Sequence, residues 1–453
     1  MRIVVVTLFA LLAFVASCKN NENKSKAKTD VYDTIIYPSA QAIDTALASA
    51  IARSANNYAN QFLIPNNYAG GLLIAWKGNI IFERYIGNKN VNGILSPIIN
   101  TDPIHVASTS KTFTAHIILL LYQQGKLKLT DTMQQFFPNF PYKNITVFNL
   151  LTHRSGLAKY DYFMEGERKK PLRFGFMLSN NDVINYMDSA KPEAYKPVNT
   201  GFQYNNTNFM LLASIAEKVS GKPFATLMHD EIFKPLGMKN SYVACAADTN
   251  RNIRSMFKNG NLYPYTELDG TYGDKNVYTT AQDMLKWHMY LQHKNRLRQS
   301  LIDSSYAGYS NEKIGIKNYG FGWRMFNLPG DKKITFHNGY WHGNNSCFTR
   351  LINDDVVIIS TGNRLCKQGY GMMSFTGFFG NYLGFEKESE DSAQGFKVDV
   401  EAANMQKFIY ENVKPVTPKP LQPIKPVKQD TAKMRLDSLK KDSLLRLKAK
   451  GKK

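Results

Sequence analysis

The stretch 108-STSKTFTAHIILLLYQQG-125 decides how the rest of this chain is interpreted. From Thr109 to Gln124 it contains no Pro or Gly, its second half is strongly apolar, and Gly125 follows where a helix end favours glycine. We therefore predict a buried helix that begins at Ser108. Lys111 then lies on the same face of that helix as Ser108.

The Ser-x-x-Lys pattern of Ser108 and Lys111 has a chemical interpretation. A serine hydroxyl is a poor nucleophile at neutral pH until a neighbouring base takes its proton, and a lysine within hydrogen-bond reach can be that base. At a helix start, unpaired amide groups and the positive end of the dipole favour the negative charge that develops during attack. An isolated match is more typical of a capping serine beside a solvated lysine, so the interpretation depends on further motifs.

A second motif, Tyr204-Asn205-Asn206, stands just before the helical stretch TNFMLLASIAEKVSG, which closes at Gly221. The tyrosine is therefore expected on a loop that enters a helix. There a phenol can pass a proton to a leaving group if cationic neighbours favour its ionised form, and the Asn206 amide can hold both Lys111 and a substrate carbonyl. The alternative is a core tyrosine beside an asparagine that caps the helix.

A third motif, His337-Asn338-Gly339, follows the alternating stretch KITFH, which predicts a strand. The glycine would let a substrate backbone lie close against that strand. The amide of Tyr340 is a candidate oxyanion donor, with the amide of Ser108 as its partner. Together, the three motifs in this order predict a serine acyl-transfer site.

The chain resembles the serine β-lactamase-like superfamily, in the branch of class C β-lactamases, penicillin-binding D-stereospecific peptidases and family VIII esterases. The resemblance covers residues 44–385. Beyond the three motifs it is carried by LLTHRSGL at 150–157, EIFKPLGMKNSYV at 231–243, VYTTAQDMLKW at 277–287 and YGFGWRM at 319–325.

The resemblance implies roles for individual residues. Ser108 would be the acylated nucleophile and Lys111 its base, while Tyr204 would carry the proton to the leaving group and later activate water. Asn206 would position Lys111 and the acyl side chain. The remaining substrate-binding positions would line the strand edge along which substrate lies, namely His337, Gly339 and Tyr340.

His337 departs from the pattern, because β-lactamases and penicillin-binding proteins of this superfamily mostly carry a lysine there that holds the substrate carboxylate. A histidine side chain has an unperturbed pKa of about 6.5 against about 10.4 for lysine, so the position is expected to be uncharged at neutral pH. This weakens the case for a β-lactam or a peptide with a free carboxylate. Esters, amides and peptides with an N-terminal D-amino acid remain open.

Three functions are consistent with these residues. The first is a serine hydrolase that cleaves an ester, amide or D-amino acid peptide through an acyl-enzyme. The second is a β-lactamase or penicillin-binding D,D-peptidase. The third is a non-catalytic cell-wall binding module, against which the intact Ser108, Lys111 and Tyr204 speak.

The arrangement of predicted elements indicates an α+β fold of the β-lactamase/transpeptidase-like kind. With 453 residues, 43% of them hydrophobic, the chain can bury a substantial core. Residues 70–87 predict a hairpin about a Gly78-Asn79 turn. Further strands are expected at 319–326, 333–337, 345–353 and 356–362. We predict one antiparallel sheet assembled from both chain ends and flanked by helices, with an inserted, mainly helical region.

The N-terminus predicts a bacterial lipoprotein signal. An apolar run from Ile3 to Ala16 follows Arg2, and Val15-Ala16-Ser17-Cys18 then precedes a polar stretch. Cys18 would be the lipidated residue, with residues 1–18 as signal and 19–43 as linker. The alternative is an ordinary secretory signal. Either way the protein is expected in the cell envelope, periplasm-facing and, with the lipid, anchored to the membrane.

Three cysteines remain after Cys18. Cys245, Cys347 and Cys366 form an odd number without metal-like spacing. A disulfide between Cys347 and Cys366 and three free thiols are both open. The scattered histidines predict no metal site, and we expect no cofactor.

The formal charge of +21 is concentrated at the C-terminus. Residues 414–453 contain 13 Lys or Arg against 3 Asp, which argues against nucleic acid as the partner of the folded part. Beyond an extension at 386–413, this tail combines a proline-rich spacer with a basic amphipathic stretch. It is expected either to touch an anionic lipid or cell-wall polymer or to remain solvated.

Overall fold

The computed structural model describes residues 35–164, 177–313, 315–380 and 382, together with 390–391 and 396–397. The predicted lipoprotein signal with Cys18 and the basic tail at 414–453 lie outside the described residues. Among the described helices, none combines the length and apolar character needed to cross a membrane.

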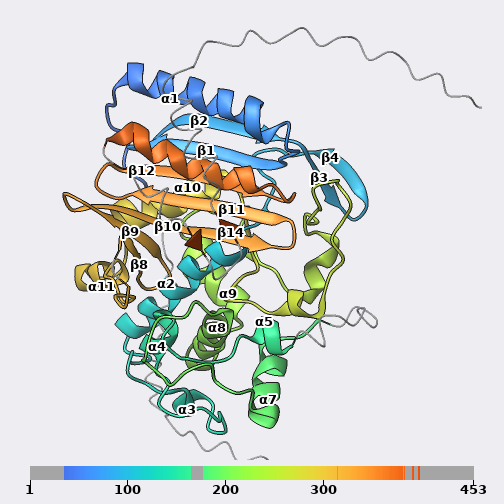
Figure 1. Cartoon of the computed structure of the whole chain (residues 1–453), viewed down its shortest axis with the longest axis vertical. Helices are drawn as coiled ribbons and strands as arrows, with labels where there is room; N and C mark the ends of the chain where they lie inside the picture. The colour runs from blue at the N-terminus through green and yellow to red at the C-terminus, as the bar shows by residue number, and fades with distance from the viewer. Residues whose placement is uncertain are drawn as a thin grey trace, which may run out of the picture. The chain divides into compact units, whose positions relative to one another are not determined.

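The architecture is built on a seven-stranded antiparallel sheet with the order β2-β1-β12-β11-β10-β9-β8 (Figure 1). The strands are β1 (Gly70–Trp76), β2 (Asn79–Ile86), β8 (Lys317–Tyr319), β9 (Arg324–Leu328), β10 (Lys332–Trp341), β11 (Asn344–Leu351) and β12 (Val356–Gly362). Because β1 pairs with β12, the sheet joins the two ends of the domain, and the predicted topology is confirmed.

Shorter strands lie outside this sheet. They are β3 (Asn88–Val91) with β4 (Ile94–Pro97), β5 (Ile104–His105) with β7 (Val277–Thr279) and β6 (Tyr242–Val243), and β13 (Glu390–Asp391) with β14 (Phe396–Lys397). The small sheet of β5, β7 and β6 matters for the site, because β5 leads directly into the segment that carries Ser108.

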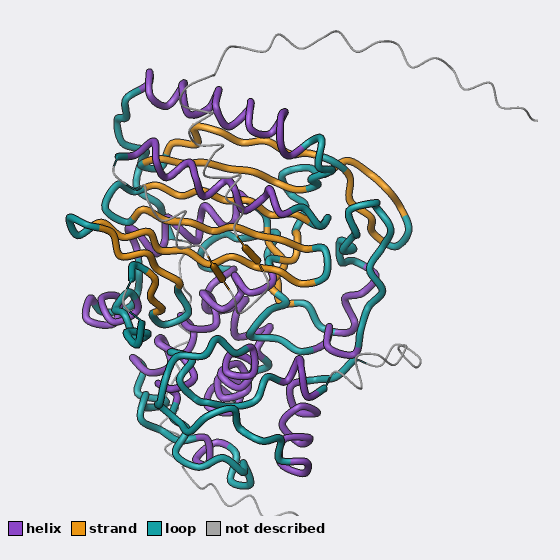
Figure 2. The backbone as a smooth tube through the Cα atoms, viewed as in Figure 1, coloured by secondary structure: helices purple, strands orange, loops and turns teal. Residues whose placement is uncertain are grey.

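The helices cover both faces of the large sheet and fill the region between the two groups of strands (Figure 2). They are α1 (Thr45–Tyr58), η1 (Ala59–Leu63), η2 (Ala107–Thr109), α2 (Ser110–Gln123), α3 (Met133–Phe136), α4 (Val147–Leu151), α5 (Tyr160–Phe163), α7 (Asn180–Ala190), α8 (Asn206–Ser220), α9 (Phe224–Met228), η3 (His229–Phe233), η4 (Ala246–Asn250), η5 (Glu267–Gly270), α10 (Ala281–Met289), η6 (Tyr290–Lys294), α11 (Gln299–Ser305) and η7 (Lys367–Phe379), where η marks a 3₁₀ or π segment.

Alternation along β12 explains why the sheet has a core on each face. Val357 and Ile359 belong to the apolar cluster that contains α2 and α8. Val356 and Ile358 point the other way, into the cluster formed with α1 and η7. A strand that is buried on both faces reads as the continuous apolar run VVII rather than an alternating one.

The first hairpin differs from its prediction by one position. The sequence favoured Gly78-Asn79 as the turn, but β2 already begins at Asn79 and the two turn residues are Lys77 and Gly78. Their φ angles are 49° and 79°, both positive, which is the conformation that a two-residue hairpin turn requires for the right-handed twist of its strands. Glycine therefore takes the second turn position rather than the first.

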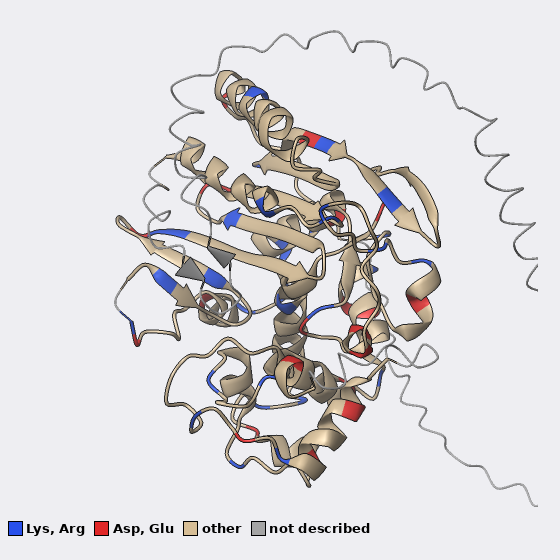
Figure 3. Ribbon diagram, turned by 45° about the vertical axis from the view of Figure 1, so that its right-hand side comes forward, with Lys and Arg blue, Asp and Glu red and all other residues tan. Residues whose placement is uncertain are grey.

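The remaining structural predictions concern cysteines, metals and charge. Cys245, Cys347 and Cys366 are all free thiols, so the disulfide alternative was wrong. Cys347 is buried within β11, which raises the pKa of its thiol to about 12. Across the described ranges, no cluster of three or more His, Cys, Asp or Glu side chains could hold a metal ion. Acidic and basic side chains are interspersed over strands and helices alike (Figure 3).

Candidate active site

Ser108 lies in the short 3₁₀ turn η2, which runs directly into α2. The helix predicted from Ser108 onward is therefore present, with its first turn tightened. The preceding residue, Ala107, has a φ of 46°, which is strained for a residue with a side chain. This turn leaves Ser108 only 4% exposed, at the end of α2 where the helix dipole is positive.

Lys111 is fully buried, and three acceptors surround its ammonium group. Lys111 Nζ donates to Ser108 Oγ at 3.1 Å, to Asn206 Oδ1 at 2.9 Å and to the main-chain oxygen of Asp274 at 2.8 Å. Three acceptors match the three N–H donors of an ammonium group. The structure thus brings Ser108, Lys111 and Asn206 together as the sequence predicted, and it adds the Asp274 carbonyl.

The Asp274 carbonyl is held in place by a buried network behind Lys111. Tyr160 OH donates to Asp274 Oδ2 at 2.8 Å and lies 2.6 Å from Lys275 Nζ, which donates to it. Both Asp274 and Lys275 are buried. Sequence analysis missed this contribution because a main-chain oxygen leaves no residue-type signal.

Tyr204 occupies the loop before α8, as predicted, and Asn205 caps that helix by accepting from Thr207 N. Two cations lie close to the Tyr204 ring. Lys111 Nζ is 5.0 Å from the ring centroid, and the guanidinium carbon of Arg324 is 4.6 Å from it. The Tyr204 hydroxyl is buried, and it has no hydrogen-bond partner within the described part of the chain.

His337 lies on β10 with its ring 6.1 Å from that of Tyr204, centroid to centroid. Its Nδ1 donates to the main-chain oxygen of Asn338 at 2.8 Å, which leaves Nε2 as the unprotonated nitrogen of the neutral ring. Burial, followed by the charges of Arg324 and Lys111, holds the pKa of His337 well below its ordinary value of 6.5. His337 is therefore neutral, as expected. Burial and the two neighbouring cations, rather than the ordinary pKa of histidine alone, keep it so.

β10 has an open edge beside this histidine. It pairs with β9 only from Lys332 to Phe336, whereas its pairing with β11 continues to Trp341. Residues 337–341 therefore have no strand neighbour on the β9 side among the described elements. Such an edge offers main-chain groups to an extended ligand.

The turn that carries Ser108 packs against β10. Thr109 Oγ1 donates to the main-chain oxygen of His337 at 3.1 Å. A Cβ at Gly339 would lie 2.1 Å from the main-chain oxygen of Val106. We expected Gly339 to make room for a substrate backbone, but the close neighbour is the chain's own backbone ahead of Ser108. Tyr340, the predicted oxyanion donor, follows on the same strand.

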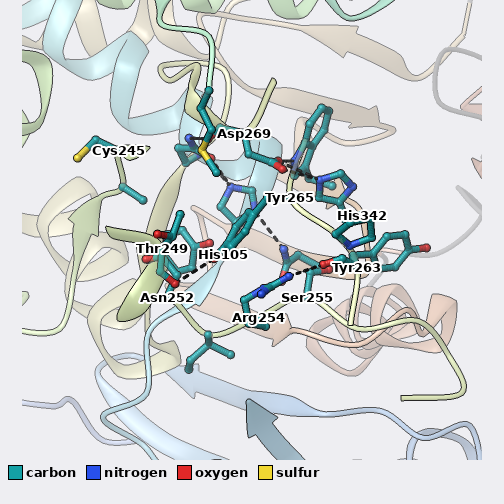
Figure 4. Close-up of a pocket in the computed structure, with 18 residues that line it drawn as sticks. His105, Cys245, Thr249, Asn252, Arg254, Ser255, Tyr263, Tyr265, Asp269 and His342 are labelled. Atoms are coloured by element: carbon teal, nitrogen blue, oxygen red, sulfur yellow. Dashed lines mark hydrogen bonds and ion pairs between the residues drawn. The ribbon is translucent and has the colours of Figure 1, made fainter. Parts of the chain in front are cut away.

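A small hollow, open to solvent, lies beside the turn after β10, and Figure 4 shows Asp269 and His342 among the residues that line it. Asp269 Oδ1 is 2.9 Å from His342 Nε2 and also accepts from Trp341 Nε1. Burial opposes ionisation of Asp269, but the charge and hydrogen bond of His342 outweigh it and lower the pKa of the carboxyl to about 2. This carboxylate ties the end of β10 to η5, and the hollow does not include the predicted nucleophile.

The fold and these side chains define a serine hydrolase of the β-lactamase/transpeptidase-like class. Residues 66–372 match the Beta-lactamase family, and the chain belongs to that family. It is 27% identical over 319 residues to penicillin-binding protein 4* of Bacillus subtilis, covering 66% of this chain and 69% of that protein. It is 28% identical to the D-alanyl-D-alanine-carboxypeptidase/endopeptidase AmpH of Escherichia coli, covering 51% of this chain and 60% of that protein.

A solved structure shares the fold. The penicillin-binding protein from Bacillus halodurans superimposes with a TM-score of 0.61 and 22% identity, covering 72% of this chain and 99% of that one. At this level of identity the likeness establishes the architecture and leaves the substrate open.

Proposed function

We propose that this protein is a cell-envelope serine hydrolase that cleaves an ester or amide bond, including that of a D-amino acid peptide, through an acyl-enzyme on Ser108. The observation that carries the proposal is the buried contact of Lys111 Nζ with Ser108 Oγ at 3.1 Å. A buried lysine held on a serine hydroxyl at the start of a helix is the arrangement that activates a nucleophile.

Lys111 acts as the base for acylation. When Nζ is neutral, two N–H bonds remain for Asn206 Oδ1 and the Asp274 carbonyl, and the lone pair faces Ser108 Oγ. The Ser108 proton moves to Nζ as Oγ forms a bond to the substrate carbonyl carbon. The carbonyl oxygen becomes an oxyanion, for which the amides of Ser108 and Tyr340 are the proposed donors.

Tyr204 completes both halves of the reaction. As the tetrahedral intermediate collapses, the bond to the leaving group breaks and the Tyr204 hydroxyl gives that group its proton. The resulting phenolate then takes a proton from water, and the hydroxide attacks the acyl carbonyl. The ester bond to Ser108 breaks, the acid is released, and Ser108 Oγ takes back the proton held on Lys111 Nζ.

Asn206 is the proposed contact for the acyl part of the substrate, and His337 and Gly339 lie on the strand edge along which the substrate would extend. The envelope location is supported by the lipoprotein-like N-terminus with Cys18 and by the relatives that are penicillin-binding proteins. We propose a lipid anchor at Cys18 and contact of the basic tail with an anionic surface. No cofactor enters this mechanism.

A fluorophosphonate probe tests the nucleophile. The purified protein should be labelled on a single serine, and Ser108→Ala should abolish labelling, because no other hydroxyl is activated by Lys111. Ser49→Ala, on the exposed side of α1, is the matched control and should label like the parent. Undiminished labelling of Ser108→Ala would refute the proposal.

A second candidate is a penicillin-binding D,D-peptidase or β-lactamase, which the two bacterial relatives favour. Fluorescent penicillin and nitrocefin separate it from the first candidate. Stable labelling by penicillin indicates the peptidase and rapid turnover of nitrocefin the β-lactamase, whereas hydrolysis of p-nitrophenyl esters alone indicates the esterase-like activity.

A further inference from the structure

His153 is a fully buried histidine that the proposed mechanism does not use. It follows α4 in the stretch LLTHRSGL at 150–157, and its φ angle is 55°. A left-handed backbone is uncommon for residues other than glycine, and where it occurs the surrounding structure holds it, often at a functional site. The position of His153 therefore calls for an explanation beyond the filling of core volume.

The contacts of His153 fall on both sides of Tyr204 in the chain. The amide of Gln203 donates to the main-chain oxygen of His153 at 2.9 Å. The amide of Asn205 donates to Nδ1 of the His153 ring at 3.2 Å. The ring itself lies against that of Tyr204, with the two centroids 4.6 Å apart. One residue thus holds the main chain before and after the tyrosine and also packs on its ring.

Hydrogen bonds fix which nitrogen of the His153 ring carries the proton. Nδ1 lies 3.2 Å from the amide nitrogen of Asn205 and 3.0 Å from Asn208 Nδ2. A main-chain N–H can only donate, and Ser155 Oγ donates to Asn208 Oδ1, so the NH₂ group of Asn208 is the one that faces the ring. Nδ1 is therefore an acceptor, and the proton lies on Nε2, which donates to Tyr319 OH at 3.1 Å.

The surroundings of His153 keep its ring in this neutral form. Burial, followed by the charges of Lys111 and Arg324, holds the pKa of His153 well below 6.5. A protonated ring would carry a hydrogen on Nδ1 and would lose its bond to the Asn205 amide. At neutral pH the acceptor for the main chain after Tyr204 is therefore in place.

The Tyr204 hydroxyl does not orient its own ring. That hydroxyl is buried, and within the described ranges it has no hydrogen-bond partner. The direction of the phenol therefore depends on its main chain and on the groups packed against the ring. The rings of Tyr319 and His337 lie 6.2 and 6.1 Å from it, centroid to centroid. His153 lies nearer than either, and it is also hydrogen-bonded to the main chain on both sides of Tyr204.

We propose that His153 is a positioning residue for the reaction. By accepting the Asn205 amide at Nδ1 and packing on the Tyr204 ring, it fixes the phenol where protons can pass to the leaving group and from water. The inference rests on the proposed hydrolase function, in which Tyr204 moves these protons while Ser108 and Lys111 form the acyl bond. Loss of His153 should therefore slow the steps that need Tyr204 and spare those that need only Ser108 and Lys111.

Two rates separate these steps. Fluorophosphonate labelling forms a bond to Ser108 Oγ, and the fluoride anion leaves without a proton from Tyr204. Turnover of a p-nitrophenyl ester also needs water to attack the acyl-enzyme, and in the proposed mechanism Tyr204 activates that water. The readout is kcat for the ester relative to the rate of labelling, both measured on the full chain.

Asparagine and glutamine distinguish the two nitrogens of the His153 ring. The oxygen of asparagine can lie where Nδ1 lies, whereas the longer glutamine places its amide near the position of Nε2. His153→Gln should lower kcat roughly 10- to 100-fold and leave the labelling rate within about threefold of the parent, because a small misplacement of a catalytic group costs this much. His153→Asn should keep kcat within about fivefold, since it retains an acceptor for the Asn205 amide. Asparagine also tolerates the left-handed backbone.

His116→Asn is the matched control. His116 is also buried and lies 2.9 Å from Tyr290 OH through Nε2, but no contact joins it to the loop of Tyr204 among the described hydrogen bonds. Its replacement should lower the temperature of thermal unfolding and leave the ratio of kcat to labelling rate unchanged.

A double variant separates positioning from a structural role. Once Tyr204→Phe has removed the hydroxyl, adding His153→Gln should lower kcat by less than about threefold, because no proton donor remains to be misplaced. A purely structural role would cost the same factor in both backgrounds.

Three results would overturn the proposal. They are a kcat of His153→Gln within about threefold of the parent, an equal fall in kcat and in the labelling rate, and a loss that is as large after Tyr204→Phe as before it. Should His153→Gln not fold, His153→Asn decides: a folded variant that keeps kcat supports the proposal, and one that loses it overturns it. Failure of the parent to label at Ser108, or to turn over any ester, would instead count against the proposed hydrolase function.

Discussion

The two sides of the candidate site differ in how their polar atoms are satisfied. On one side, Lys111 Nζ makes three hydrogen bonds of 2.8–3.1 Å and is fully buried. On the other, the Tyr204 hydroxyl and His337 Nε2 are buried without a hydrogen-bond partner among the described residues. Buried polar atoms without partners are uncommon in folded proteins, and each asks for an explanation.

The difference indicates which half of the chemistry is built into the fold. The proposed base Lys111 and the proposed nucleophile Ser108 already contact each other without substrate, as pre-organised groups should. In the proposed mechanism the Tyr204 hydroxyl gains its partner only when the leaving group of a substrate lies against it. Catalytic hydrogen bonds often tighten only when substrate is bound, which agrees with this division.

Among these substitutions, Tyr204→Phe should have the largest effect on activity. It removes the hydroxyl that the leaving group is expected to meet, and kcat/KM should fall roughly 10²- to 10⁴-fold. Tyr162→Phe, at an exposed position on α5, is the control and should keep full activity. The measurement is steady-state hydrolysis of the best substrate in a p-nitrophenyl ester and D-alanyl peptide panel. Near-normal activity of Tyr204→Phe would show that proton transfer uses another group.

Asn206→Ala tests the side of the site where Lys111 makes its three hydrogen bonds. It removes one of the three acceptors of Lys111 Nζ, so the amine loses part of its orientation toward Ser108. A hydrogen bond to a charged group corresponds to a roughly 10- to 100-fold loss in the rate of acylation, followed by fluorophosphonate labelling. Asn185→Ala, exposed on α7, should be neutral. An unchanged acylation rate would mean that the other two contacts suffice to orient Lys111.

Acidification tests the side of the site where His337 and Tyr204 lie, through its effect on the free energy of unfolding. Burial and the neighbouring cations hold the pKa values of His153 and His337 well below 6.5, so both are neutral in the folded protein. Below about pH 6.5, the two histidines of the unfolded chain become protonated, whereas those of the folded protein stay neutral. The free energy of unfolding should therefore fall by about 1 kcal/mol per histidine for each pH unit below about 6.5.

His337→Gln should remove one histidine's share of that fall, which urea unfolding at about pH 7 and about pH 5 measures. If the variant and the parent lose equal stability over this range, His337 is not the buried neutral group described. The variant serves as its own control at neutral pH, where protonation contributes nothing to the difference.

The smallest effect is expected in the pH dependence of activity. Because the pKa of His337 is lowered well below 6.5, this residue does not titrate where the enzyme works. The acid limb of kcat/KM in His337→Gln should lie within about half a pH unit of that of the parent. A larger displacement would mean that His337 carries a proton during catalysis.

Much of the fold was predictable because its signals are local. The apolar helix after Ser108, the helix closed by Gly221 and the strands of the second half each depend on residues that are neighbours in sequence. The hairpin was placed correctly, but its turn was shifted by one residue, since both Lys77-Gly78 and Gly78-Asn79 are acceptable turn sequences. Gly339 was noticed, but its neighbour was misjudged, because only packing shows which backbone approaches a glycine.

The site was predicted in part for the same reason. Motifs identified Ser108, Lys111, Tyr204 and Asn206, and the structure places the other three around Lys111 Nζ. Arg324 was overlooked although it lies within the quoted stretch YGFGWRM, because nothing in that stretch tells which side chain lies beside Tyr204.

The sequence by itself determined the order of the elements, the pairing of Ser108 with Lys111, and the class of enzyme, since these depend on short patterns and on the order in which they occur. The tertiary structure decided where the charges of the site lie. Arg324, Tyr204 and His337 are distant in the chain, and their mutual distance, burial and protonation depend on how β9, β10 and the loop before α8 pack. Electrostatic interactions act through space, so only the folded arrangement could show that a neutral histidine has an arginine beside it.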